Sequence, residues 1–169
     1  MKPPATHHLK DYTAPPFAID RVDLIFDIQK NHTTVTSTLS VRKCVTPPDK
    51  PYPLTLDLKD LAVTKVIAGT MVLLPGEYQV TEESLIIPNT PETFDLEIEC
   101  RIKPDQNTSL EGLYRSGKFL CTQCEAQGFR KITPFLDRPD VMAVYSCTII
   151  ADKTEYPILL SNGNPVKTG

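Results

Sequence analysis

The sequence lacks the features that mark nucleic-acid-binding, membrane-spanning and secreted proteins. Its formal net charge is only -3 and it has no run of Lys or Arg, so neither nucleic acid nor an anionic membrane surface is an expected partner. No apolar run approaches the length of a membrane helix. Residues 1–12 are polar and lack the apolar stretch of a secretory signal. These absences predict a cytoplasmic protein.

The cysteines lack the pattern of a disulfide framework. There are five, an odd number, and their spacing is uneven, which fits a reducing cytoplasm. A chain of 169 residues fits one domain and is long enough to bury a core. We therefore expect a single domain over residues 1–169, with residues 1–12 as a flexible arm.

Several catalytic motifs are also missing. The sequence has no Gly-rich phosphate loop and no Gly-X-Ser-X-Gly elbow. Its three histidines, His7, His8 and His32, have no Cys or Ser partner nearby in the sequence. A catalytic triad could therefore form only through the fold, and the sequence gives it little support.

The main pattern that is present is an alternation of apolar and polar residues. It is clearest in residues 21–28, 34–44 and 94–102, and a period of two predicts half-buried strands of antiparallel sheets. Sixteen prolines argue against long helices. Shorter strands are expected at residues 54–58, 63–68, 78–80, 85–87, 141–150 and 157–161. The sequence therefore predicts an all-β fold, a sandwich of curved antiparallel sheets.

Two segments interrupt this pattern. Residues 104–130 are weakly periodic, and a long connection inside a compact β domain is often where function lies. Asn162-Gly163 predicts a hairpin after a strand at residues 156–161, but the chain ends at Gly169 before a returning strand is complete. We therefore expect a domain that is truncated near its C-terminal hairpin.

The long connection ends in a Cys-X-X-Cys pair, Cys121 and Cys124. A closed zinc site needs four ligands, and the sequence has no second Cys-X-X-Cys. A thioredoxin-like role needs the pair at a junction between a strand and a helix, which this segment does not predict. We favour two small, partly buried side chains in a tight loop, with a metal-binding or redox role as the alternative.

Gln123 and Glu125 lie between and beside the two cysteines. In an extended segment, residues two apart point to the same side. A carboxylate and an amide oxygen on one side can bind an ammonium group, because the carboxylate supplies charge and the amide a directional acceptor. The alternative is a solvent-exposed strand surface, which from spacing alone is the more common outcome.

A charged turn, Asp137-Arg138-Pro139-Asp140, precedes the strand expected at residues 141–150. Its two carboxylates can pair with Arg138 or accept backbone N–H groups, and we interpret the cluster as structural. Glycoside chemistry by Glu125 with Asp137 or Asp140 is an alternative, although nothing in the sequence sets the distance between these groups.

Four segments of the second half of the chain resemble bacterial aminopeptidase N. They are residues 110–117, 121–130, 136–143 and 149–164, and residues 11–27 also resemble the start of that family's N-terminal domain. The family comprises zinc metallopeptidases of the alanyl aminopeptidase type. The resemblance covers most of the chain and is weaker between residues 30 and 103.

This resemblance implies a fold and a function. The family's N-terminal domain is a saddle-shaped β structure packed on a thermolysin-like catalytic domain. The residues matched by Gln123 and Glu125 bind the free α-amine of a peptide substrate in that family. A desolvated ammonium needs a counter-charge, so Glu125 is the stronger of the two assignments. The partners implied are the N-terminus of a peptide and the catalytic domain, with zinc as the cofactor of the full-length enzyme.

The sequence also departs from the family. The zinc motif His-Glu-X-X-His and the exopeptidase motif Gly-Ala-Met-Glu-Asn are both absent. We therefore expect this chain alone to contain no catalytic residue, to bind no metal and to hydrolyse nothing. With its catalytic partner missing, it could self-associate through an exposed interface or an edge strand near residues 156–161. The alternative function is a stand-alone β-sandwich binding module.

Overall fold

The computed structural model describes residues 8–44 and 52–168. Most of the arm expected at residues 1–12, including His7, lies outside these ranges. The described part of the arm contains one exposed turn of 3-10 helix, η1 (Leu9–Asp11). No helix in the described residues is long and apolar enough to cross a membrane.

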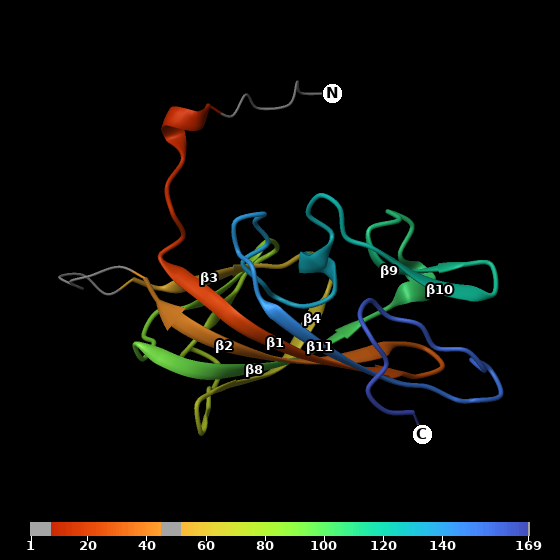
Figure 1. The fold of residues 1–169 in the computed structure, drawn as a ribbon. Helices are drawn as coiled ribbons and strands as arrows, with labels where there is room; N and C mark the ends of the chain where they lie inside the picture. The colour runs from red at the N-terminus through yellow and green to blue at the C-terminus, as the bar shows by residue number, and fades with distance from the viewer. Residues whose placement is uncertain (1–7, 45–51, 169) are drawn as a thin grey trace.

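The largest element is a six-stranded sheet with the strand order β11-β1-β2-β8-β4-β5. Its neighbouring strands are antiparallel, except that β11 pairs with β1 in parallel. Figure 1 shows the long strands β1, β2 and β8 side by side, with β11 along the outer edge of β1. The strand bounds are β1 (Phe17–Ile28), β2 (Thr33–Lys43), β4 (Ala62–Ala68), β5 (Met71–Val72), β8 (Thr93–Ile102) and β11 (Val144–Ile150).

Two smaller sheets complete the fold. One has the order β3-β7-β6 and the other is the hairpin of β9 and β10. A 3-10 turn follows each of β8 and β10. The bounds are β3 (Leu54–Asp57), β6 (Gln79–Val80), β7 (Ser84–Ile87), β9 (Gly112–Ser116), β10 (Phe119–Gln123), η2 (Pro104–Gln106) and η3 (Phe129–Lys131).

The core lies between the six-stranded and three-stranded sheets. In β2 and β8 every second residue is buried, as the alternation predicts. In β1 the buried positions change from odd to even numbers at a register shift between Ile19 and Arg21, where an extra residue reverses the alternation. The fully buried side chains include Phe17, Ile19, Val22, Val35, Leu39, Val41, Leu54, Leu56, Leu85, Ile87, Leu96 and Ile98.

The segment after η3 rests on this core. Ile132, Phe135 and Leu136 are buried in the core cluster. Beside them, the Thr133 hydroxyl lies 2.7 Å from the Ser37 hydroxyl of β2, and both side chains are fully buried. This segment therefore connects η3 rigidly to the large sheet, which sets the position of the loop before η3.

The all-β prediction is confirmed, and strands occur at each expected place from residue 21 to residue 102. The purely antiparallel prediction is wrong for β11, because alternation gives the period of a strand and not its direction. The strand and hairpin predicted at residues 156–163 are also wrong. No strand forms there, and residues 152–156 close a turn in which the Tyr156 N–H donates to the Asp152 carbonyl at 2.8 Å. The self-association edge expected near residues 156–161 is therefore not a strand edge.

Candidate functional site

Gln123 and Glu125 lie at the exposed tip where β10 turns back toward the core. Gln123 is the last residue of β10 and pairs with Gly112 of β9, and Glu125 begins a turn that runs to Gly128. We call residues 123–128 the amine turn. The premise of an extended segment is wrong, because the strand ends at Gln123. Both side chains are exposed, and neither makes a hydrogen bond or ion pair within the described part of the chain. Both are therefore available to a ligand.

Two glycines allow the amine turn to close against β9. The Gly128 N–H donates to the Cys124 carbonyl at 2.8 Å. A Cβ at Gly128 would lie 2.5 Å from the Gln123 carbonyl oxygen and 2.9 Å from the Cys124 Cα, which the turn has no room for. Gly112 has φ +72°, and a Cβ there would lie 2.8 Å from the Lys131 Cβ. The compact shape of the turn therefore depends on glycine at both positions.

Three aromatic side chains pack together directly after the amine turn. The Phe129 ring packs edge-on against Phe135 with a centroid distance of 4.9 Å, and against Tyr145 of β11 at 6.0 Å. Phe135 belongs to the buried core. The residue that follows the amine turn is thus packed between the core and the edge strand of the large sheet.

Arg130 joins three segments beneath the turn. Its Nε donates to the Asp137 Oδ2 at 2.9 Å, its Nη2 donates to the Asp137 carbonyl at 3.2 Å, and its Nη1 lies 3.6 Å from the Asp57 Oδ1. The Asp137 N–H in turn donates to the Asp57 Oδ2 at 3.1 Å. The Asp137 side chain is only 11% exposed, so this ion pair is well shielded from water.

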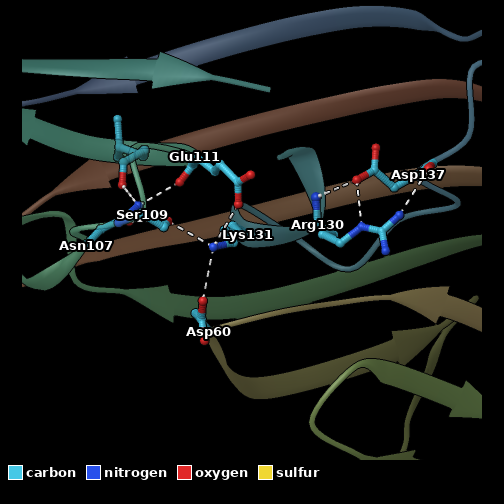
Figure 2. Close-up of polar contacts among 8 residues, drawn as sticks. Asp60, Asn107, Ser109, Glu111, Arg130, Lys131 and Asp137 are labelled. Atoms are coloured by element: carbon cyan, nitrogen blue, oxygen red, sulfur yellow. Dashed lines mark hydrogen bonds and ion pairs between the residues drawn. The ribbon is translucent and has the colours of Figure 1, made fainter. Parts of the chain in front are cut away.

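Lys131 forms a second cluster on the other side. Its ammonium donates to the Ser109 hydroxyl at 2.9 Å and lies 3.0 Å from Glu111 and 3.2 Å from Asp60. Hydrogen bonds and ion pairs raise the pKa of Lys131 against the opposing effect of burial. Asn107 donates to the carbonyls on both sides of Gly112, at 2.7 and 2.9 Å. Figure 2 shows the Lys131 and Arg130 clusters on opposite sides of η3.

The cysteines of the pair are free thiols. Cys121 and Cys124 are both partly buried and form no disulfide. Burial raises the pKa of the Cys124 thiol, and the Asp137 carboxylate raises it further, so the reactive thiolate is disfavoured. The described residues contain no group of three or more His, Cys, Asp or Glu side chains that could hold a metal ion. The geometry thus gives the zinc and redox alternatives no support, and the absence of zinc from this chain stays a prediction.

The charged turn after the core segment is structural, as predicted. Arg138 binds both carboxylate oxygens of Asp140, at 2.9 and 2.7 Å, and donates to the Thr13 carbonyl at 2.9 Å. The Tyr12 ring lies 6.0 Å from the guanidinium carbon of Arg138. Asp137 and Asp140 are thus each paired with an arginine, which leaves glycoside chemistry with Glu125 unsupported.

Sequence reasoning missed the residues that hold the site together. Arg130, Lys131, Asp57 and Gly112 were not singled out, because their partners lie between 7 and 80 residues away along the chain. The only sequence signal of these clusters is that two adjacent cations, Arg130 and Lys131, directly precede the mostly apolar segment 132–136.

The structure is thus an open, β-rich domain of mixed sheets with an exposed polar turn at one end of a hairpin. Residues 19–169 match the family described as Peptidase M1 N-terminal domain, and the chain belongs to this family. It is 45% identical over 166 residues to aminopeptidase N of Escherichia coli (strain K12), a match that covers 98% of this chain and 18% of the relative. The chain thus spans about a fifth of the length of this curated relative.

Solved structures agree with this assignment. Legionella pneumophila aminopeptidase A, in complex with aspartic acid, superposes with a TM-score of 0.81 and 33% identity, over 92% of this chain and 18% of that chain. An M1 zinc metallopeptidase from Deinococcus radiodurans, bound to a Tyr-Ser-Ala substrate, gives a TM-score of 0.64 at 17% identity, over 79% of this chain and 32% of that one. The second match shows the shared fold alone.

Proposed function

We propose that this chain is the substrate-amine-recognising domain of a zinc aminopeptidase that removes N-terminal residues from peptides. The observation that carries the proposal is that Gln123 and Glu125 are exposed on a tightly held turn and make no side-chain hydrogen bond or ion pair with the described residues. The full-length relative is named aminopeptidase N, which fits a site that selects a free amine.

Glu125 and Gln123 can each contribute a different interaction. A peptide α-amine has a pKa of about 8 and is therefore mostly an ammonium ion at neutral pH. Glu125 supplies the opposite charge, and Gln123 supplies a directional carbonyl acceptor for a second N–H. An acylated N-terminus has neither the charge nor the donors. The pair would therefore accept only the first residue of a peptide and place its peptide bond at the reacting centre.

The zinc of the proposed enzyme would be bound elsewhere. The described residues of this chain do not fit a zinc site, since no three potential ligands lie together. The metal, and the activated water it would supply, would belong to the remaining four-fifths of the full-length protein. The isolated chain is accordingly expected to be inactive.

The direct test is an assay of the full-length protein with a Glu125→Gln variant. The wild type should cleave an alanyl chromogenic amide but not its N-acetyl derivative. Loss of one charged hydrogen bond, about 1.5–3 kcal/mol, should lower kcat/KM by about 10-fold to 100-fold in the variant. Glu92→Gln is the matched control, because Glu92 is exposed and directly precedes β8, at the end of that strand away from Cys100, whose thiol contacts Ile132 of the segment after η3. Unchanged kcat/KM in Glu125→Gln would overturn the proposed site.

We further propose that the rest of the protein covers the apolar surface around β11. Five of its side chains are strongly exposed, Met142, Val144, Ile158, Leu160 and Val166, with Leu160 at 84%. This stretch of the chain exposes several large apolar side chains, and a large exposed apolar surface marks an interface. Self-association of the isolated chain through this surface is the corresponding prediction, and sedimentation of a strict monomer at high concentration would contradict it.

The alternative, a stand-alone binding module, predicts a different result. An isolated chain with that role would bind its ligand without any partner domain. Calorimetry with alanine amide tests this, because a single exposed carboxylate and amide should bind a small ammonium only weakly. Tight binding by the isolated chain would favour the module.

We also propose a cytoplasmic location. All five cysteines are free thiols, including the exposed Cys44 and Cys147, which fits a reducing compartment. Recovery of the protein in a secreted fraction with oxidised cysteines would contradict this.

A further inference from the structure

We propose that Arg130 is a positioning residue that fixes the amine turn, so that Glu125 and Gln123 meet the same substrate ammonium. This inference rests on the proposed function. Arg130 does not reach the exposed side chains of the turn. It acts through the backbone that connects them to the core.

The contacts of Arg130 fasten the exit of the amine turn. Its backbone N–H lies 3.3 Å from the Asp137 Oδ2, which its own Nε also binds at 2.9 Å. Its backbone carbonyl accepts the Lys59 N–H at 3.0 Å. The main chain and the guanidinium of one residue are thus both attached to segments of the core. The turn immediately before it cannot move as a unit without breaking these bonds.

Arg130 also has an electrostatic role, because its guanidinium pairs with the shielded Asp137 carboxylate. Burial, together with the Asp137 carboxylate, raises the pKa of the thiol of Cys124, which lies between the two proposed amine-binding residues in the chain. Arg130 neutralises that carboxylate. Without it, a shielded and unpaired negative charge would remain under the turn, and the local structure would have to rearrange to hydrate or pair it. Glu125 and Gln123 would then lose their fixed separation.

Lys131 holds the other side of the same turn. Its ammonium binds Glu111 (Figure 2), the residue directly before Gly112. Gly112 in turn pairs with Gln123 across the hairpin. The strand end that carries Gln123 is thus supported from Lys131, and the turn end beyond Glu125 from Arg130. The two consecutive cations bracket the pair of proposed amine ligands.

The geometry requires arginine at position 130. Three nitrogens of the guanidinium serve two different residues, Asp137 and Asp57. A lysine has one ammonium on a flexible stem and cannot reproduce this planar arrangement. Charge alone is therefore not sufficient for the role.

The test is a double-mutant cycle in the full-length protein. Arg130→Gln, Glu125→Gln and the double variant are compared by kcat and KM on an alanyl chromogenic amide. Misplacement of the amine ligands by about 1 Å should lower kcat/KM of Arg130→Gln by about 10-fold to 100-fold. Once Glu125 has been removed, adding Arg130→Gln should lower kcat/KM by clearly less than it does in the wild type, because only the Gln123 interaction is left to misplace. Arg130→Lys should recover little of the loss.

The outcomes separate this inference from the proposed function. If Glu125→Gln has no effect, the amine site itself is wrong. If Glu125→Gln lowers kcat/KM but Arg130→Gln does not, or if the two losses multiply, only the positioning role is wrong. Arg42→Gln is the matched control, because it breaks an exposed pair with Asp20 at the other side of the sheet and should leave kcat/KM unchanged.

A second measurement does not depend on activity. The rate of alkylation of Cys124, followed by mass spectrometry, reports how well the amine turn is packed. Release of the turn in Arg130→Gln should raise this rate several-fold while alkylation of the exposed Cys147 stays unchanged. Arg130→Lys, which keeps the positive charge, replaces Arg130→Gln if that variant fails to fold, and it should raise the Cys124 rate in the same way. An unchanged Cys124 rate in a folded variant would overturn the positioning role.

Discussion

The chain before residue 103 and the chain after it are built on different interactions. In the first part, long strands bury alternate apolar side chains between two sheets, and the ion pairs lie on the exposed face. In the second part, strands are short, β11 is exposed along most of its length, and the loops are held by partly buried ion pairs at Arg130 and Lys131. The comparison indicates that the first part supplies most of the buried core, while the second carries the proposed recognition site.

The largest expected effect comes from deleting core volume in the first part. Leu39 of β2 is fully buried, so Leu39→Ala should lower the free energy of unfolding by about 2–5 kcal/mol. Leu160, which is 84% exposed in the second part, provides the contrast, and Leu160→Ala should change it by less than about 0.5 kcal/mol. Urea unfolding of this chain measures both. Equal losses of unfolding free energy in the two variants would contradict the assignment of the stabilising core to the first part.

The next effect tests how tightly the amine turn is packed. Gly128→Ala places a methyl group 2.5 Å from the Gln123 carbonyl and should lower the free energy of unfolding by about 1–3 kcal/mol. Loss of amine-dependent kcat/KM should accompany it in the full-length protein. Gly69→Ala is the matched control, because its Cβ meets nothing within 4 Å, and only the left-handed backbone, worth about 1 kcal/mol, opposes it. A variant of Gly128 that keeps full stability and activity would show that the turn has room to adjust.

A pH experiment measures how the buried Cys100 thiol, in the first part of the chain, contributes to the free energy of unfolding. Burial raises the pKa of Cys100 in β8 to about 12 from an ordinary value near 9. The folded state therefore keeps its proton between these values while the unfolded state loses it. The free energy of unfolding should fall with rising pH over this window, by about 1.4 kcal/mol per pH unit from this group. Cys100→Ala should make that slope shallower in urea titrations between pH 9 and 11, and an unchanged slope would assign it to other groups.

The smallest expected effect is the loss of unfolding free energy when Lys131 is replaced, and Arg130 provides the comparison. Lys131→Met replaces a buried ammonium by an apolar side chain and leaves two largely exposed carboxylates, Asp60 and Glu111, which water can solvate. Its free energy of unfolding should change by less than about 1 kcal/mol. Arg130→Met should destabilise more, because it leaves the shielded Asp137 without its partner. Thermal unfolding of the two variants side by side measures the difference, and the reverse order would contradict the assigned burial.

The sequence predicts the first part of the molecule much better than the second. The strands at β1, β2 and β8 are visible because half-buried strands impose a period of two on the residues themselves. The hairpin of β9 and β10 was missed, since its burial does not alternate and its register depends on Gly112 and Gly128 meeting. The direction of β11 was missed as well, because alternation is the same in parallel and antiparallel strands.

The candidate site shows the same limit. The residue types of Gln123 and Glu125 indicate an ammonium receptor, and this stays a prediction. The clusters around Arg130 and Lys131 depend on partners brought together only by the fold, such as Asp57, which lies 80 residues from Asp137. No local pattern encodes such contacts.

The parallel pairing of β11 with β1 has a consequence for the order of folding. β1 hydrogen-bonds on one side to β2, its neighbour along the chain, but on the other side to a strand about 123 residues later, the separation of Asp23 and Ser146. Contacts between residues so far apart in the chain form slowly, because closing a long loop is entropically unfavourable. During synthesis, one edge of β1 therefore stays unpaired until almost the whole of this chain has left the ribosome, and the strand behind the proposed recognition site is the last to join the sheet.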